Sequence, residues 1–362
     1  MTIDLSLSPF APTAVRSIRT SLCAATLFAA SARAAAQAPS QPRLTLIDSV
    51  RITENERIDI GKPNAIAVAP DGAVFISDIS ARRVIRADRK GVLTVVAPHG
   101  GGPGEVEAST ALTVMGDSLL VIKNSGRRRF ELFDLHTLRF RSGFFANWKS
   151  TSLASWHGTL IMGALSIDSL YAFAIVTDSL HTPTHGGTVP EILRKNPPVA
   201  QAFGDVHVAR DDSTVFGVFE VSNTMYRWRL GKRLDVDSIV MRVSTRRGAK
   251  PDVIERLLRE PNKAAELAFT WSAPLVIAPL SAQRTAALFY DPTMQGTTYT
   301  GPSFLQIVDW RSHKSCGEIR LPVPSDVVPR FAFRDDTLVA IVQHSDEGEA
   351  WIVRWKISAG RC

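Results

Sequence analysis

Six polar residues occupy equivalent places along the chain and carry groups suited to binding a ligand. Each follows the second apolar run in a group of such runs: Asp78, Asn124, Asp168, Asn223, Asp291 and His344. Carboxylate and amide oxygens are hard ligands that suit Ca²⁺ or Mg²⁺. Asp and Asn are also typical of tight turns, because their side chains bond to the local backbone. The pattern therefore leaves two interpretations open, a ligand site and a ring of ordinary turns.

Complete catalytic signatures are missing from the sequence. His99 precedes three glycines, as in the oxyanion loop of lipases, but no Gly-x-Ser-x-Gly elbow supplies a nucleophile. The Gly-rich stretch 100–104 lacks the Gly-Lys-Ser/Thr of a phosphate loop. There is no His-Glu-x-x-His and no Cys-x-x-Cys, which argues against a zinc enzyme. We therefore expect no catalytic residues and no cofactor, with Ca²⁺ as the alternative.

The elements that position these side chains are predicted to be short strands. Residues 64–98 hold four apolar runs separated by Gly, Pro and Asp, which is typical of a four-stranded antiparallel unit. Similar groups begin near residues 110, 152, 205, 273 and 330. The first turn carries Asp or Gly in five of the six groups, as in Asp71-Gly72, and only Ser281-Ala282 departs from this pattern. The chain is thus predicted to be a repeat protein.

The number of strands predicts that the array closes into a ring. The sixth group ends one strand short, and residues 44–52 alternate like a strand ahead of the first group. Pairing that early strand with the last group removes exposed sheet edges. We predict an all-β, six-bladed β-propeller over residues 44–362, closed by its N-terminal strand. Residues 251–269, ahead of the fifth blade, show apolar positions at helical spacing interrupted by Pro261, which predicts two short helices.

The N-terminal segment is typical of an export signal. Arg16 and Arg19 precede an apolar run at 21–32, and small residues follow at 34–36, so residues 1–36 are interpreted as a signal peptide and 37–43 as a disordered linker. The apolar run is too short to be a membrane span. Without residues 1–36 the formal charge falls from +7 to +5, since that segment holds three arginines and one aspartate. A net charge this small does not indicate a nucleic-acid partner, and we expect none.

Two cysteines remain after the signal peptide, Cys316 and Cys362. Export, to the periplasm or out of the cell, allows a disulfide to persist. In the predicted ring the two residues fall on adjacent blades at one face, so a bridge between them is geometrically feasible. Two buried free thiols are the alternative.

Residues 63–91, PNAIAVAPDGAVFISDISARRVIRADRKG, resemble a propeller repeat of the NHL type, and HGGGPGEVEAS at 99–109 is similar to the connector of exported bacterial six-bladed propellers of the NHL-repeat and TolB-like superfamily. The resemblance covers the first two blades. It implies the propeller fold. It leaves the activity open, because that superfamily includes binding modules, sugar-lactone hydrolases and lyases.

The predicted function is that of an exported, non-catalytic module that binds a protein, a peptide or a cell-envelope glycan through the loops of one face. The candidate binding residues lie in those loops and at the channel mouth: Asn64, Asp78, Asn124, Arg127, Asp168, Asn223, Asp291 and His344. The alternative, implied by the resemblance, is a lactonase-like hydrolase that holds a divalent cation with Asp78, Asn124 and Asn223.

Overall fold

A computed structural model describes most of the chain beyond residue 40. The described residues are 41–362 without positions 57, 146–151, 167–170, 177–183, 232–233, 242–250, 261–262, 264–266, 268–270, 296–297, 325–328, 344–348 and 361. The expected signal peptide, residues 1–36, and the first part of the expected linker lie outside this set.

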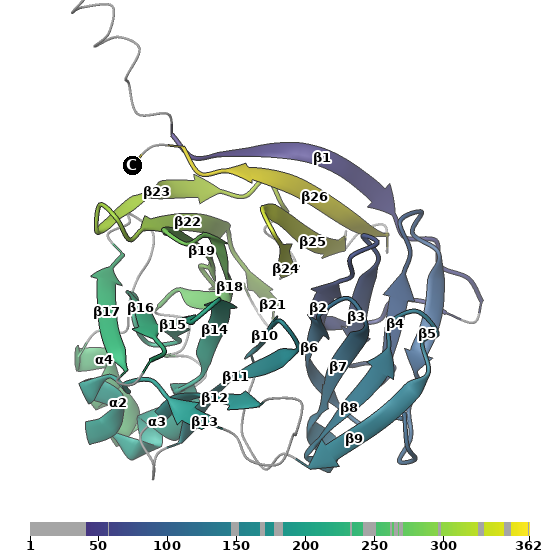
Figure 1. Cartoon of the computed structure of the whole chain (residues 1–362), viewed down its shortest axis with the longest axis horizontal. Helices are drawn as coiled ribbons and strands as arrows, with labels where there is room; N and C mark the ends of the chain where they lie inside the picture. The colour runs from purple at the N-terminus through teal and green to yellow at the C-terminus, as the bar shows by residue number, and fades with distance from the viewer. Residues whose placement is uncertain are drawn as a thin grey trace, which may run out of the picture. The chain divides into compact units, whose positions relative to one another are not determined.

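The described residues fold into six four-stranded antiparallel sheets arranged in a ring (Figure 1). Blades one to three consist of β2 (Pro63–Val68), β3 (Val74–Asp78), β4 (Arg83–Ala87) and β5 (Leu93–Ala97); β6 (Ser109–Met115), β7 (Leu119–Asn124), β8 (Arg129–Asp134) and β9 (Phe140–Phe145); and β10 (Ser152–Trp156), β11 (Thr159–Ser166), β12 (Tyr171–Val176) and β13 (Thr184–Gly186). Blades four to six consist of β14 (Val206–Asp211), β15 (Thr214–Phe219), β16 (Thr224–Arg229) and β17 (Asp235–Val240); β18 (Ala273–Ser281), β19 (Arg284–Tyr290), β22 (Ser303–Asp309) and β23 (Lys314–Arg320); and β24 (Arg330–Arg334), β25 (Thr337–Gln343), β26 (Ala350–Ser358) and β1 (Arg43–Arg51). The predicted all-β, six-bladed propeller is confirmed.

The first and last strands of the chain close the ring together. β1 pairs antiparallel with β26, so that Leu44 lies opposite Ile357 and Arg51 opposite Trp351. Figure 1 shows the purple β1 alongside the yellow β26 on the outside of blade six. The prediction that residues 44–52 complete the last blade is therefore confirmed. Pairing with β1 covers the outer edge of β26 and gives blade six the four strands of the other blades.

The core lies at the boundaries between blades. Buried apolar side chains form six clusters, one between each pair of neighbouring blades. The boundary that closes the ring packs Val68 and Ile76 of blade one against Val339 and Ile352 of blade six. Each fully buried aliphatic side chain of this kind stabilises the fold by about 1.5–3 kcal/mol. The period-two alternation of the strands thus supplies both faces of every blade with packing residues.

The turns between first and second strands lie on one face of the ring, here called the bottom face, where the inner strands end. Five of the six have a residue with positive φ, the conformation that tight reversals require: Gly72 (81°), Gly116 (59°), His157 (45°), Asp212 (44°) and Asp335 (52°). Between Ser281 and Arg284, the one turn that departs from the sequence pattern, no residue has positive φ. The recurring Asp and Gly residues therefore mark the turns for the expected reason.

The opposite face, here called the top face, is where the inner strands begin, and it carries longer connections. Helix α4 (Pro251–Arg259) precedes blade five as predicted, while most of the second predicted helix lies outside the described residues. Four further elements were not predicted from the sequence: α2 (Glu191–Lys195) and α3 (Pro197–Phe203), which follow a Gly/Pro-rich stretch, the hairpin of β20 (Thr293–Gln295) and β21 (Thr298–Thr300), and the 3-10 turn η1 (Ser125–Arg127). Figure 1 shows α2, α3 and α4 grouped beside blades three and four, away from the centre of the ring. No helix among the described residues is long and apolar enough to cross a membrane.

Candidate functional site

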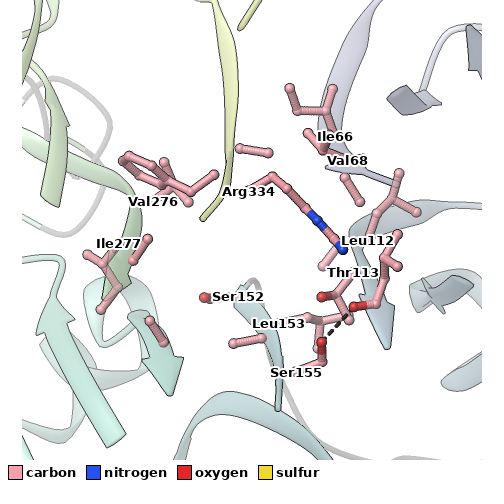
Figure 2. Close-up of a pocket in the computed structure, with 18 of the residues that line it drawn as sticks. Ile66, Val68, Leu112, Thr113, Ser152, Leu153, Ser155, Val276, Ile277 and Arg334 are labelled. Atoms are coloured by element: carbon pink, nitrogen blue, oxygen red, sulfur yellow. Dashed lines mark hydrogen bonds between the residues drawn. The ribbon is translucent and has the colours of Figure 1, made fainter. Parts of the chain in front are cut away.

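The inner strands of the six blades surround a central channel. Its volume is about 910 Å³, and residues of β2, β6, β10, β14, β18 and β24 line it. Figure 2 shows side chains from these strands converging on an open space. Pockets of this size are large enough to take a small molecule. The channel is thus the concave site that the fold provides.

The top mouth of the channel is polar. Residues near the start of five inner strands line it: Asn64, Thr110, Ser152, His207 and Arg330. Neighbouring members are linked across blades, because the Asn64 side-chain amide donates to the Thr110 carbonyl over 3.5 Å. Thr110 in turn shares a hydrogen bond of 2.5 Å with the Ser125 hydroxyl. Asn64, one of the predicted binding residues, thus lines this mouth.

The middle of the channel is apolar. Side chains from blades one, two, three and five form the wall: Ile66, Leu112, Leu153, Val276 and Ile277 (Figure 2). The Ser155 hydroxyl, which is turned to the backbone, donates to the Val114 carbonyl over 2.6 Å. A ligand in this part of the channel meets hydrocarbon, and its burial there is driven by the removal of apolar surface from water.

The bottom of the channel is charged. Arg334 extends from β24 into the lumen (Figure 2), where its guanidinium lies 3.4 Å from Asp117 and 4.0 Å from Asp335. These two carboxylates are 82% and 90% exposed, so the pairs are weak. Arg210, which also lines the channel, donates through Nε to the Asp212 carbonyl. Burial lowers the pKa of Arg210, and burial followed by the charge of Asp212 raises the pKa of Asp211.

Arg330, at the top mouth, is a partly buried cation of the channel lining. Its Nε donates to the Pro63 carbonyl over 3.1 Å. Burial lowers the pKa of Arg330, which the nearby Tyr290 partly offsets. Burial also raises the pKa of Tyr290 to about 12, with Arg330 acting in the opposite direction. The Tyr290 hydroxyl is buried without a hydrogen-bond partner among the described residues.

Asp78 and Asn124, two of the expected ligands, are engaged with the backbone. The Asp78 side chain has no exposed area, and its oxygens accept hydrogen bonds from the amides of Gly61, Lys62 and Ser80. The Asn124 carboxamide oxygen accepts two such bonds, and its NH₂ donates to a carbonyl. A cation at these side chains has to displace those hydrogen bonds, so the residues as placed do not fit a calcium site.

The remaining expected site residues are dispersed around the top face. The Asp291 carboxylate accepts a hydrogen bond of 3.1 Å from the Ser272 hydroxyl. The Asn223 carbonyl accepts one of 2.9 Å from the Met241 amide. Arg127 pairs with Glu107 at 3.0 Å, both being partly exposed. Asp168 and His344 lie outside the described residues.

Within the described part of the chain, one group of three His, Cys, Asp or Glu side chains has metal-ligand geometry. It consists of Asp309, Cys316 and Cys362, whose ligand atoms lie within 4.8 Å of one another. Cys316 and Cys362 are also juxtaposed as a disulfide pair, with Cα atoms 4.6 Å apart. The Asp309 carboxylate already accepts bonds from Arg284 and from two backbone amides. The close approach of the two sulfurs suits a disulfide between blades five and six better than a metal site, because bonded sulfurs are not metal ligands.

The arginines of the channel are not among the predicted site residues, although the sequence carries a signal for them. The first run of the sixth group, RFAFR at 330–334, has arginine at both ends and alanine in the middle. An innermost strand has apolar neighbours on both faces and only the channel beside it. Charged residues at alternating positions of such a strand therefore point to the lumen.

Comparisons with known proteins show the fold. No protein-family model matches the sequence, and no curated protein sequence matches it. Similar solved structures include a DUF4221 family member from Bacteroides vulgatus ATCC 8482, with a TM-score of 0.61, 8% identity and coverage of 89% of this chain and 99% of that one. A Bacteroides fragilis NCTC 9343 protein described as exported has a TM-score of 0.58, 9% identity and coverage of 89% and 97%. The WD40 repeats of RRP9 have a TM-score of 0.52, 10% identity and coverage of 88% and 99%.

Proposed function

We propose that this protein is an exported binding module that holds a protein or peptide of the cell envelope on its top face. The observation that carries the proposal is the difference between the two faces. The described bottom turns between first and second strands are short, while the top connections contain α2, α3, α4 and the β20–β21 hairpin. Propeller scaffolds bind through loops of this kind, because loops vary while the blades stay fixed.

A protein or peptide is favoured over a glycan by the placement of the aromatic side chains. Sugar sites use exposed aromatic faces for stacking, and four of the seven tryptophans of the chain are buried between blades: Trp228, Trp271, Trp310 and Trp355. The top face instead offers mixed contacts, such as the 36% exposed Ile79 and the Arg127–Glu107 pair. Interfaces with proteins combine apolar and charged groups in this way.

Three observations support export. The N-terminal 36 residues have the order of charges, apolar run and small residues that signal peptides share. The juxtaposition of Cys316 and Cys362 suits an oxidising compartment. One of the structures similar in fold is of a protein described as exported, which is in keeping with this location.

Site-specific crosslinking in the native cell envelope tests the proposal. A photoreactive residue is placed at Ile79 or Arg127 on the top face, and at Asp117 or Gln283 in the bottom turns as matched controls, since all four are solvent-accessible. The proposal expects a discrete protein adduct from the top positions alone. Equal adducts from the bottom positions, or none from the top, contradict it.

A further inference from the structure

The inner strand of blade six places a cation at each end of the channel. Arg330, Ala332 and Arg334 alternate along β24, so both arginines lie on the same side of the strand. Four residues of strand separate them by about 13 Å. Both arginines line the channel. Ile66, Leu112 and Ile277, which form its apolar wall, line the same space.

Arg330 has no acidic partner among the described residues, in contrast to three other shielded arginines of the ring. Arg83 pairs with Asp59 at 2.6 Å, Arg284 with Asp309 at 3.1 Å and Arg354 with Asp48 at 2.8 Å. Arg330 donates one hydrogen bond, to the Pro63 carbonyl, and its other guanidinium donors have no partner among the described residues. A shielded cation is stabilised by an anion, because burial without one is costly.

The charges that line the channel are unevenly distributed. Three arginines, Arg210, Arg330 and Arg334, face two carboxylates, Asp117 and Asp335. Both carboxylates belong to the bottom end and are more than four-fifths exposed to solvent. The top end, with Arg330, therefore favours a negative group, and the apolar middle favours hydrocarbon next to it.

From this arrangement we propose that the channel is a binding site for an organic acid with an apolar body, whose carboxylate contacts Arg330 at the top mouth and whose hydrocarbon lies along the inner strands. This site is separate from the loop surface proposed above and does not depend on it. Asn64 and Thr110, next along the mouth, provide further polar contacts for the head group. No bond is made or broken in this binding event.

The proposal is tested by calorimetry with octanoate as the probe, and with octanol and acetate as the neutral and short comparisons. The purified protein is compared with Arg330→Met and with Arg229→Met, a control whose arginine pairs with Asp235 on β17 of blade four, away from the channel lining. Loss of one charge-assisted hydrogen bond weakens binding by about tenfold to a hundredfold. We expect octanoate to bind more tightly than octanol or acetate, R330M to lose that preference by at least tenfold, and R229M to keep it.

Octanol serves as the folding control for R330M, because its binding uses only the apolar wall and is expected to be unchanged. The proposal is overturned if the native protein shows no preference for octanoate over octanol. It is also overturned if R330M keeps the preference while Arg334→Met loses it, since the anion would then lie at the bottom of the channel. If octanoate binds in the channel while the crosslinks from the top face fail, the channel site stands and the proposed protein-binding function does not.

Discussion

Asp78 and Asn124 are the last residues of the second strands in blades one and two, and each accepts hydrogen bonds from the two residues that precede its own inner strand. Asp78 accepts from Gly61 and Lys62 at 3.0 Å, and Asn124 from Glu107 and Ala108 at 3.3 and 3.4 Å. The same position in both blades thus fixes the segment that enters the channel wall. These side chains stabilise the top face rather than standing free above it.

Replacement of Asp78 by alanine is expected to lower the free energy of unfolding by about 2–4 kcal/mol, because the backbone amides of Gly61, Lys62, Ser80 and Ala81 lose their buried acceptor. Urea titration measures the change. Asp59→Ala is the control, since Asp59 is 70% exposed and its loss is expected to cost under 1 kcal/mol. The loss for Asp78→Ala is expected to be the same in EDTA and in Ca²⁺. A loss seen only with Ca²⁺ would instead support a metal site.

The blades could be predicted from sequence because each strand carries its own signal. Alternating apolar residues define the strands, and Gly or Asp at positive φ defines the turns, as at Gly72 and Asp335. Ring closure followed from counting, since β1 had no other blade to join. Both faces of every blade are buried, so the apolar pattern of each strand in the sequence matches its environment in the fold.

The candidate site was less predictable, because its character depends on which neighbours surround each side chain. An aspartate at position 78 suits both a cation site and the cap of a loop. Only the structure shows that the backbone amides of Gly61 and Lys62 donate hydrogen bonds to its carboxylate. Helices α2 and α3 were missed since they are short and start in a Gly/Pro-rich stretch, where helix formation depends on packing of residues such as Leu193 and Phe203.

Ring closure is expected to depend on Arg354. Its guanidinium, 9% exposed, contacts Asp48 of β1 at 2.8 Å and the Gly72 carbonyl of blade one at 2.9 Å. Arg354→Met is expected to lower the free energy of unfolding by about 1–3 kcal/mol. Arg51→Met provides the matched control, because Arg51 of β1 pairs with Glu349, the residue before β26, but its side chain is 63% exposed. Equal effects of the two changes would show that burial of Arg354 does not matter.

The pairing of Cys316 with Cys362 is expected to be oxidised in the exported protein. Mass spectrometry of the unreduced protein after alkylation should show no modified cysteine. Serine at both positions is expected to lower stability by about 2–4 kcal/mol, because the bridge closes a loop with a sequence separation of 46. Complete alkylation without prior reduction would show two free thiols.

Processing of the N-terminus gives a direct test of export. Cleavage after Ala36 is expected to leave Gln37 as the first residue of the protein recovered from the periplasm or medium. N-terminal sequencing measures this. Ala36→Lys serves as the comparison, since a large charged residue at the cleavage position should block processing. Recovery of the full-length chain in the exported fraction would contradict the predicted boundary.

Tyr290 is expected to make stability fall at alkaline pH. Burial raises the pKa of its hydroxyl to about 12 in the folded protein, from an ordinary value of 10.0. Between these values the unfolded chain releases the proton and the folded protein keeps it, so stability is intact below pH 10 and declines as pH rises toward 12, by at most about 1.4 kcal/mol per pH unit.

The variant Tyr290→Phe removes this pH dependence. Burial also raises the pKa of Tyr226, but that residue contributes equally to the native protein and to the variant. The difference in unfolding free energy between native protein and Y290F, measured in urea at about pH 9, 10 and 11, is therefore expected to fall above pH 10. Parallel curves over this range would show that the folded environment does not hold the proton on Tyr290.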